Sequence, residues 1–540
     1  MPTISRPPPV LGFGIRLDNA ELQDDMFPCA LDPDFSEEES ESRMPILTLR
    51  EIRMLQFMNQ VTDKDEWEAK VFDEEITHKW KMEATGTLEA DFTPEMAEYC
   101  IEELKYKAEI FKETGYVHVY NGDVVKSDSA IPTDLRNALK KAVSPLEDVP
   151  AEQLDWHPGS NNQVLDLVHP SLCPLVYGLS RILPDRTVGL EDCMSHCGEG
   201  EVIPQPSEDL GLVNFGPSQK YRAYSRRFQW LPCDVDIAGE TPRIVSYINN
   251  LHPQLRQGLY RIIEKVIEKV IPLWNASLSS LLSMDWPRRI QYGVDVGVEY
   301  ENGNVVQPNP QPFSREDFER EDDDSESSGV DLKEEYADTG LQVIVKLASI
   351  HLSPDKPTYN GGTWHVEGQL DVENEHICAT AIYYYDVENI TPSHLAFRQA
   401  SDTREVEEEV PYEQNDWAWV EPIFGLRTDE PAIQPVGSVL AREGRVVTFP
   451  NLLQHRVQPF ELADPTKPGH RKILALFLVD PHVRVISTAN IPCQQREWWT
   501  KSINESGEGH DEFPIGSEKA KAAERGTHGR EKAVCDRISR

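Results

Sequence analysis

In the first part of the chain, apolar residues recur at helical spacing. Thr48-Leu-Arg-Glu51 has the pattern of a capping box, and Ile52, Leu55 and Met58 continue one apolar face, so a helix is predicted to begin there. Thr93-Pro94 opens a second helix. Its apolar stripe ends before a glycine and consists of Ala97, Ile101, Leu104, Ala108 and Phe111. Further helices are predicted over Pro132–Val143 and from Leu255 to Val270.

From Leu341 onward the pattern changes to short apolar, β-branched runs separated by turns. Such runs without intervening helical periods are typical of strands in a barrel or jelly roll. Two earlier stretches, Phe228–Ile237 and Arg243–Asn249, are also strand-like. The predicted strands of the second half are Leu341–Ile350, Ile377–Tyr385, Val436–Phe449, Leu452–Phe460 and Arg471–Val479. The fold class is therefore predicted to be α+β.

With 540 residues the chain is too long for one simple core, and its composition changes along the sequence. Residues 1–44 are rich in proline and then acidic, which predicts a disordered arm. Residues 45–220 form a predicted α-rich domain. Residues 221–500 form a predicted β domain that contains a disordered acidic insert at 314–335, and residues 501–540 form a predicted flexible tail.

The formal net charge of −40 argues against a nucleic-acid partner and against attraction to anionic membranes. No apolar run is long enough to span a bilayer, and the first residues lack the pattern of a signal peptide. The nine cysteines are scattered and odd in number, as expected for reduced thiols. We therefore expect a cytoplasmic or nuclear protein that is not secreted.

A candidate metal site lies in the stretch Gly361-Gly-Thr-Trp-His-Val-Glu-Gly368. Residues two apart on a strand project from one face, so His365 and Glu367 can present an imidazole and a carboxylate to the same point. A third candidate, His455, follows 90 residues later. Two histidines and one carboxylate on one face of a metal leave adjacent positions open, and this set serves non-haem Fe(II) oxygenases.

A candidate anchor for a co-substrate follows on the last strong strand. Arg471 lies 16 residues beyond His455, and a guanidinium can hold a carboxylate such as the far one of 2-oxoglutarate. Lys472 is the alternative anchor, because strand alternation lets only one of the two point inward. Tyr385, on the same strand face as Tyr383, is a candidate for a hydrogen bond to the co-substrate, although a core role for these tyrosines is equally open.

Together these motifs resemble known enzymes. Trp364-His-x-Glu367, Gly444-x-x-x-Thr-Phe-Pro450, His455 and Gly469-His-Arg471 resemble Fe(II)/2-oxoglutarate-dependent dioxygenases of the double-stranded β-helix type, especially prolyl-hydroxylase-like ones. The chain from about Thr48 to Trp499 also resembles a fungal family catalogued as domain of unknown function 4246 (DUF4246). The stretches that carry this second resemblance include Phe228–Cys233, Ala381–Ile390 and Asp464–Asp480.

The resemblance implies a double-stranded β-helix (jelly-roll) core with a large α-helical N-terminal region. It implies iron ligation by His365, Glu367 and His455, and binding of 2-oxoglutarate by Arg471. The expected function is hydroxylation of an unidentified small-molecule or peptide substrate by an oxidoreductase. Two alternatives stay open: a non-catalytic interaction protein on an oxygenase-derived barrel, and a cupin-like metal enzyme that does not use 2-oxoglutarate. The sequence does not indicate an oligomeric state.

Overall fold

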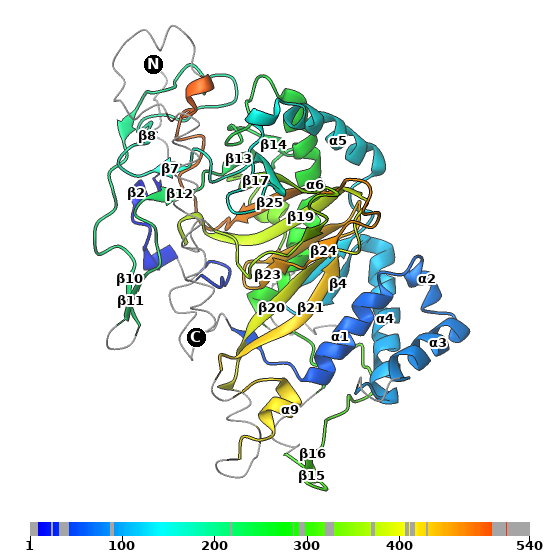
Figure 1. The fold of residues 1–540 in the computed structure, drawn as a ribbon. Coiled ribbons are helices and arrows are strands. Elements are labelled where there is room, and N and C mark those ends of the chain that lie inside the picture. Colours follow the sequence, from blue (N-terminus) through cyan, green and yellow to red (C-terminus); the bar gives the residue numbers. More distant parts are fainter. Residues whose placement is uncertain are drawn as a thin grey trace.

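A computed structural model gives the arrangement of the chain (Figure 1). It describes residues 9–22, 25–31, 43–86, 91–215, 219–284, 286–290, 298–318, 329–368, 373–404, 410, 416–427, 430–498 and 515. Parts of the predicted arm (1–8, 23–24 and 32–42), the centre of the predicted acidic insert (319–328) and nearly all of the predicted tail lie outside the described residues.

The larger of the two main sheets is antiparallel and has nine strands. Its order is β14-β13-β17-β25-β19-β22-β5-β4, and β6 pairs with β17 off this path. The strands are β4 (Val117–Tyr120), β5 (Val124–Ser127), β6 (Val164–Val168), β13 (Cys233–Asp236), β14 (Arg243–Ile244), β17 (Leu341–Leu352), β19 (Ile377–Glu388), β22 (Val446–Pro450) and β25 (Gly469–Val479). Parts of the predicted α-rich region, β4 to β6, therefore belong to this sheet.

The smaller sheet has four strands in the order β21-β20-β23, with β3 pairing β20. These strands are β3 (Met44–Pro45), β20 (His394–Asp402), β21 (Ile433–Leu440) and β23 (Gln454–Val457). The predicted strand Val436–Phe449 is thus two strands, one in each sheet, because the chain turns at Gly444, whose φ of 91° suits glycine.

The two sheets pack face to face through one apolar cluster. Side chains of β17, β19, β22 and β25 in the larger sheet share this cluster with side chains of β20 and β21. The rings of Phe397 and Phe449, one from each sheet, have centroids 5.0 Å apart. The structure therefore has mixed α+β character, with an apolar cluster packed between the two sheets.

Helices cover the outer face of the larger sheet. α6 (Gln257–Ser279), which corresponds to the helix predicted from Leu255, and α5 (Thr133–Glu147) pack on β19 and β22. The Ser277 and Thr448 hydroxyls lie 2.8 Å apart at this contact. The apolar face of α6 and the outer face of the larger sheet form a second apolar cluster, which stabilises the sheet from outside.

The N-terminal helices gather at one side of the sheets, near β4 and β21 (Figure 1). They are α1 (Leu49–Val61), α2 (Trp67–Lys70), α3 (Glu74–Thr85) and α4 (Pro94–Thr114). Thr48 caps α1 by accepting the Glu51 amide, but the Glu51 carboxylate accepts the backbone N–H of Arg289 rather than closing a capping box. α4 begins with Pro94 and ends at Gly115, as predicted.

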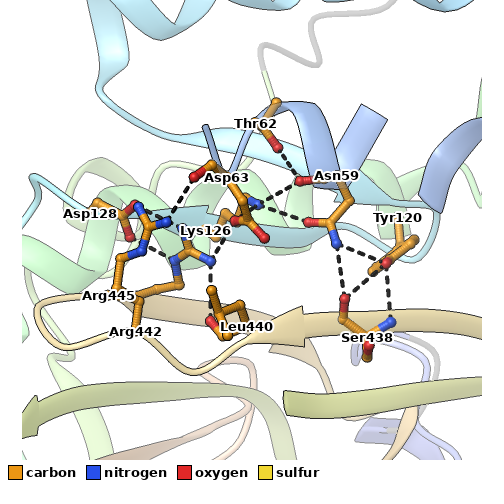
Figure 2. A network of polar contacts seen from close by, with 10 residues as sticks. All are labelled: Asn59, Thr62, Asp63, Tyr120, Lys126, Asp128, Ser438, Leu440, Arg442 and Arg445. Atoms are coloured by element: carbon orange, nitrogen blue, oxygen red, sulfur yellow. Dashed lines mark hydrogen bonds and ion pairs between the residues drawn. The ribbon is translucent and has the colours of Figure 1, made fainter. Parts of the chain in front are cut away.

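A polar network ties the end of α1 to both sheets (Figure 2). The buried ammonium of Lys126 donates to Asn59 and, at 2.6 Å, to Asp63. The Arg445 guanidinium bonds Asp63 and Asp128, at 2.7 and 2.6 Å. Arg442 also pairs with Asp128, at 3.3 Å, so three cations and two carboxylates meet at this junction and each charge has an opposite partner.

The remaining elements are short. None of the helices in the described part of the chain has the length and apolar content that crossing a bilayer requires. The eight described cysteines are free thiols. The short elements are β1 (Val10–Leu11), β2 (Gly14–Ile15), β7 (Leu175–Val176), β8 (Arg181–Ile182), β9 (Glu201–Val202), β10 (Leu212–Phe215), β11 (Gln219–Arg222), β12 (Phe228–Gln229), β15 (Tyr300–Glu301), β16 (Asn304–Val305), α7 (Leu332–Glu335), β18 (Thr358–Tyr359), α9 (Val420–Phe424) and β24 (Phe460–Glu461).

Candidate metal centre

Three side chains converge between the sheets. The Nε2 atom of His455 lies 3.2 Å from Oε1 of Glu367, and Nε2 of His365 lies 3.9 Å from the same oxygen. One possible ligand atom from each of the three residues lies within 4.8 Å of the others. The structure thus brings together the three residues that the sequence predicts as ligands, and their role as ligands stays a prediction.

Backbone hydrogen bonds place the two histidines side by side. The amide of His365 donates to the carbonyl of His455 at 3.1 Å, and the reverse bond measures 2.9 Å. Directly opposed residues of an antiparallel pair project from the same face, so the two imidazoles meet with ring centroids 4.3 Å apart. The long sequence interval between them is therefore bridged by a single strand pairing.

A buried amide fixes the third candidate ligand. The Asn451 side chain accepts the backbone N–H of Glu367 at 2.8 Å and donates to its carbonyl at 2.9 Å. Asn451 follows β22 directly and is completely buried. It therefore holds the peptide of Glu367 from both sides, which limits the positions of the carboxylate.

The position of the ring proton of His365 suits metal binding. Nδ1 of His365 donates to the carbonyl of Thr363 at 3.0 Å, which leaves the Nε2 lone pair directed at the site. Desolvation and the neighbouring His455 lower the pKa of His365 to about 4, so this ring is neutral at pH 7. Burial would raise the pKa of Glu367, but both histidines and Lys346 outweigh it and hold the pKa at about 2. A carboxylate and neutral imidazoles are the protonation states that a metal ion requires.

The site is apolar on one side and open on another. The rings of Phe449 and Phe397 lie 4.8 and 6.5 Å from the ring of His455, measured between centroids. The side chain of His455 is 3% exposed, whereas that of His365 is 39% exposed. A ligand bound at the three groups would therefore be reached past His365, with a dry wall behind it.

Arg471 is a buried cation that contacts no carboxylate among the described residues. Its Nη1 donates to the hydroxyl of Ser393 at 2.7 Å, and its guanidinium carbon lies 5.4 Å from the ring centres of Tyr384 and Phe460. Its Nε atom has no hydrogen-bond partner. Burial lowers the pKa of Arg471 from its ordinary value. A buried guanidinium of this kind needs an anion, and a ligand carboxylate would supply it.

The alternative anchor, Lys472, lies on the opposite face of β25. Its ammonium binds Glu147 at 2.9 Å and Asp386 at 3.4 Å, so it has anionic partners within the protein. Strand alternation therefore directs Arg471 rather than Lys472 into the space between the sheets.

Tyr385 does not lie with the other predicted site residues. It belongs to the apolar cluster under α5 and α6, together with Tyr383, on the outer face of β19. Tyr384, on the inner face, is the tyrosine next to Arg471. The placement of Tyr385 beside a co-substrate is corrected accordingly, because β19 is buried on both faces and the sequence alone does not identify the inner one.

Sequence reasoning missed three residues around the site: Asn451, Ser393 and Lys346. Lys346 is a lone charge in the apolar run of β17, and that exception to the pattern is a signal that could have identified it. Asn451 and Ser393 lie just beyond strand ends, where a polar residue is ordinary, so nothing in the sequence marks them.

A second group of two histidines and one carboxylate lies on β6 and the loops beside it. Ligand atoms of His157, Asp166 and His169 also lie within 4.8 Å of one another. Nδ1 of His157 lies 2.8 Å from Asp166 Oδ2, and Nδ1 of His169 accepts the amide of Ser171 at 3.2 Å. The stretch Asn161–Leu183 is irregular in sequence, so no periodicity pointed to this cluster.

Two family models match the chain. The model described as "Protein of unknown function (DUF4246)" matches residues 94–502, which is more than half of the chain. The model described as "Domain of unknown function DUF4246, N-terminal" matches residues 10–83. No curated protein matches the chain.

The chain is weakly similar to three solved structures, each at 10% identity. For a dioxygenase for auxin oxidation (DAO) in rice the TM-score is 0.22, covering 70% of this chain and 79% of that one. For the selenomethionine-labelled Fe(II)/(alpha)ketoglutarate-dependent dioxygenase TqaL it is 0.22, with 65% and 94% covered. For IDO from Bacillus thuringiensis it is 0.15, with 26% and 46% covered, so the chain spans less than half of that protein. At such low scores the function has to be derived from the residues of the site.

Proposed function

This chain belongs to the family described as protein of unknown function (DUF4246), a description that states no activity, and from its site we propose that it is an Fe(II)- and 2-oxoglutarate-dependent dioxygenase. The observation that carries the proposal is the combination of His365, Glu367 and His455 with the buried guanidinium of Arg471, which contacts no carboxylate of the described chain. The triad suits Fe(II), and the guanidinium suits the far carboxylate of a keto acid.

The strand order supports the proposal. Along the chain, β17, β19, β22 and β25 belong to the larger sheet, and the His365 segment, β20, β21 and β23 fall between them and pair with one another. Four strands of the larger sheet thus interleave in sequence with the four segments that pair opposite them, which is the strand order of a jelly roll, so we infer a double-stranded β-helix core.

In this proposal an iron ion supplies the oxidative chemistry when it is bound with dioxygen and the keto acid. The net reaction converts substrate C–H, dioxygen and 2-oxoglutarate into substrate C–OH, succinate and carbon dioxide. The chain's own residues hold the ligands, orient the co-acid through Arg471 and Ser393, and exclude water with Phe449 and Phe397. We infer a small-molecule or peptide substrate rather than nucleic acid, because the net charge is −40.

The test is an anaerobic titration of the metal-free protein with Fe(II) and 2-oxoglutarate, followed by the visible charge-transfer absorption of the chelate. We expect the band in wild type, its loss in His365→Ala, and a tenfold or larger rise in the co-acid concentration required by Arg471→Ala. His157→Ala and Lys472→Ala are the matched controls and are expected to behave as wild type. A folded wild-type protein that gives no band contradicts the proposal, and a band unaffected by His365→Ala contradicts the assignment of the ligands.

A further inference from the structure

Lys346 is a charged side chain on the inner wall of the larger sheet. On β17 it pairs with Ala475 of β25, between the pairs of Ile344 with Phe477 and of Ala348 with Ile473. Residues that pair across two strands share a face of the sheet. Ile344, Ala475 and Phe477 belong to the apolar cluster between the sheets, and Ile473 packs against it. Lys346 therefore projects from the inner face of the larger sheet, toward the smaller sheet that contains His455.

Within the described chain Lys346 makes no hydrogen bond and no ion pair closer than 4.0 Å, although it is partly buried. In the larger sheet Lys346 shares a row with Ala475, Ile382 and Val447, and the next row on this face contains Phe449, whose ring lies 4.8 Å from the ring of His455. The row on the other side contains Ala348, which pairs with Asp166. Lys346 therefore lies between the row beside the candidate metal centre and the row of Asp166.

The charges around Lys346 and the metal centre do not balance once a metal is present. Lys346, Arg471 and a divalent ion bring four positive charges, whereas Glu367 and Asp166 bring two negative ones. A poorly hydrated interior does not tolerate a surplus of two positive charges. A ligand with two carboxylates supplies the two missing negative charges.

We propose that Lys346 binds one carboxylate of a dicarboxylic ligand beside the metal centre, and that Arg471 binds the other. The proposal rests on the function proposed above and gives it a second basic residue, so that the co-acid is held at both ends.

The register of the sheet supports this arrangement. Arg471 pairs with Ile350, four residues from Lys346 along β17, and this separates the two side-chain roots by about 13 Å along the strand. The Arg471 guanidinium lies 5.4 Å from the ring centre of Tyr384. Tyr384 pairs with Ile473, which in turn pairs with Ala348, two residues from Lys346, so the guanidinium extends from its root toward Lys346. Both cations have long side chains, so their charged ends can lie closer together than their roots.

Binding of glutarate and of pentanoate to the metal-free protein, measured by calorimetry, tests the proposal without any turnover. The two acids have the same carbon chain, and only glutarate has two carboxylates. We expect wild type to prefer glutarate, and Lys346→Met to weaken glutarate binding at least tenfold while pentanoate binding changes by less than twofold. Lys472→Met removes the same charge from the outer face and is expected to behave as wild type.

Lys346→Arg keeps the charge and is expected to retain most of the preference, which separates charge pairing from a general loss of packing. The same titrations in the presence of Mn(II), with 2-oxoglutarate as ligand, provide a second measurement. Glutarate affinity in a folded Lys346→Met protein within twofold of wild type overturns the proposal, as does a wild type that binds neither acid under both conditions. If the protein prefers glutarate as expected but gives no iron chelate band, the oxygenase function is rejected and the dicarboxylate site is retained.

Discussion

Two clusters of the molecule contain two histidines and one carboxylate each, but they differ in where the ring protons lie. In the candidate metal centre, Nδ1 of His365 donates to the carbonyl of Thr363, so the Nε2 lone pair is directed at Glu367. Nε2 of His455 lies 3.2 Å from the Glu367 carboxylate, which can only accept, so Nε2 carries the proton in this contact while Nδ1 has no hydrogen-bond partner among the described residues. A cation that displaces this one proton would meet two nitrogen lone pairs and one carboxylate.

In the second cluster, hydrogen bonds to both Nδ1 atoms fix the ring protons. The ionised Asp166 can only accept, so Nδ1 of His157 carries the proton in the 2.8 Å contact between them. The amide of Ser171 can only donate, so Nδ1 of His169 accepts and the proton of the neutral ring is on Nε2. The comparison teaches that two clusters of the same composition and similar spacing can differ in the hydrogen bonds behind their rings, and these bonds decide which nitrogen lone pairs a cation could reach.

The largest expected contrast is in metal affinity. His365→Ala removes one of three ligands and is expected to weaken Fe(II) or Zn(II) binding by more than about 100-fold, whereas His157→Ala leaves it within twofold of wild type. Metal content after dialysis, measured by mass spectrometry, together with competition against a chelator, checks both. Equal losses in the two variants would remove the distinction between the clusters.

Asn451→Ala is expected to lower metal affinity by about 10- to 100-fold, because the peptide of Glu367 loses the side chain that holds it on both sides. The same competition assay measures the change. Asn59→Ala, which removes an amide from the network of Figure 2 instead, is the matched control and is expected to leave metal affinity unchanged.

Asp166→Asn is expected to reduce the free energy of unfolding by about 2 kcal/mol while metal affinity stays within twofold, since a buried charge-assisted hydrogen bond to His157 is lost. Urea unfolding of the metal-free protein measures the change. A gain in stability would show that the carboxylate is retained for a reason other than the fold.

The same residue predicts an acid dependence. Burial would raise the pKa of Asp166, but the neighbouring His169 and His157 outweigh it and hold the pKa at about 2. Because the folded-state pKa lies below the ordinary value, the contribution is complete above about pH 4 and is lost as the pH falls through about 2. It amounts to about 2 kcal/mol, and Asp166→Asn should flatten this part of the stability profile.

The smallest expected effects separate the two faces of β19. Tyr384→Leu removes the ring beside Arg471 and is expected to weaken 2-oxoglutarate binding about fivefold. Tyr385→Phe, on the outer face, is expected to leave it unchanged. Calorimetric titration of the Mn(II)-loaded protein checks both, and a larger effect of Tyr385→Phe would reverse the assignment of the inner face.

The sequence predicted the residues of the metal cluster better than their surroundings. His365 and Glu367 are two apart on an extended segment, so their common side follows from local geometry alone. The pairing of His365 with His455 depends on a contact between segments 90 residues apart, and only the order of motifs suggested it. Their function as ligands stays a prediction.

The inner face of the long strands could not be predicted because β17, β19 and β25 are buried on both sides. Such strands lack the alternation of polar and apolar residues that identifies a core face. A break in register between Tyr384 and Asp386 further changes which residues of β19 lie opposite Arg471. The helices were easier to predict, because their signals are local: an amphipathic period and, for α4, Pro94 at its start and Gly115 at its end.

The backbone pairing of His365 with His455 also bears on how the fold is held closed. An ion bound by both rings would tether the ends of a 90-residue stretch of chain, and the unfolded ensemble would lose the freedom that this loop otherwise has. A covalent cross-link of that length is worth about 4 to 5 kcal/mol in the chain-entropy model. A metal bound there would then act as a removable cross-link between these two segments, and a chelator would lower the free energy of unfolding.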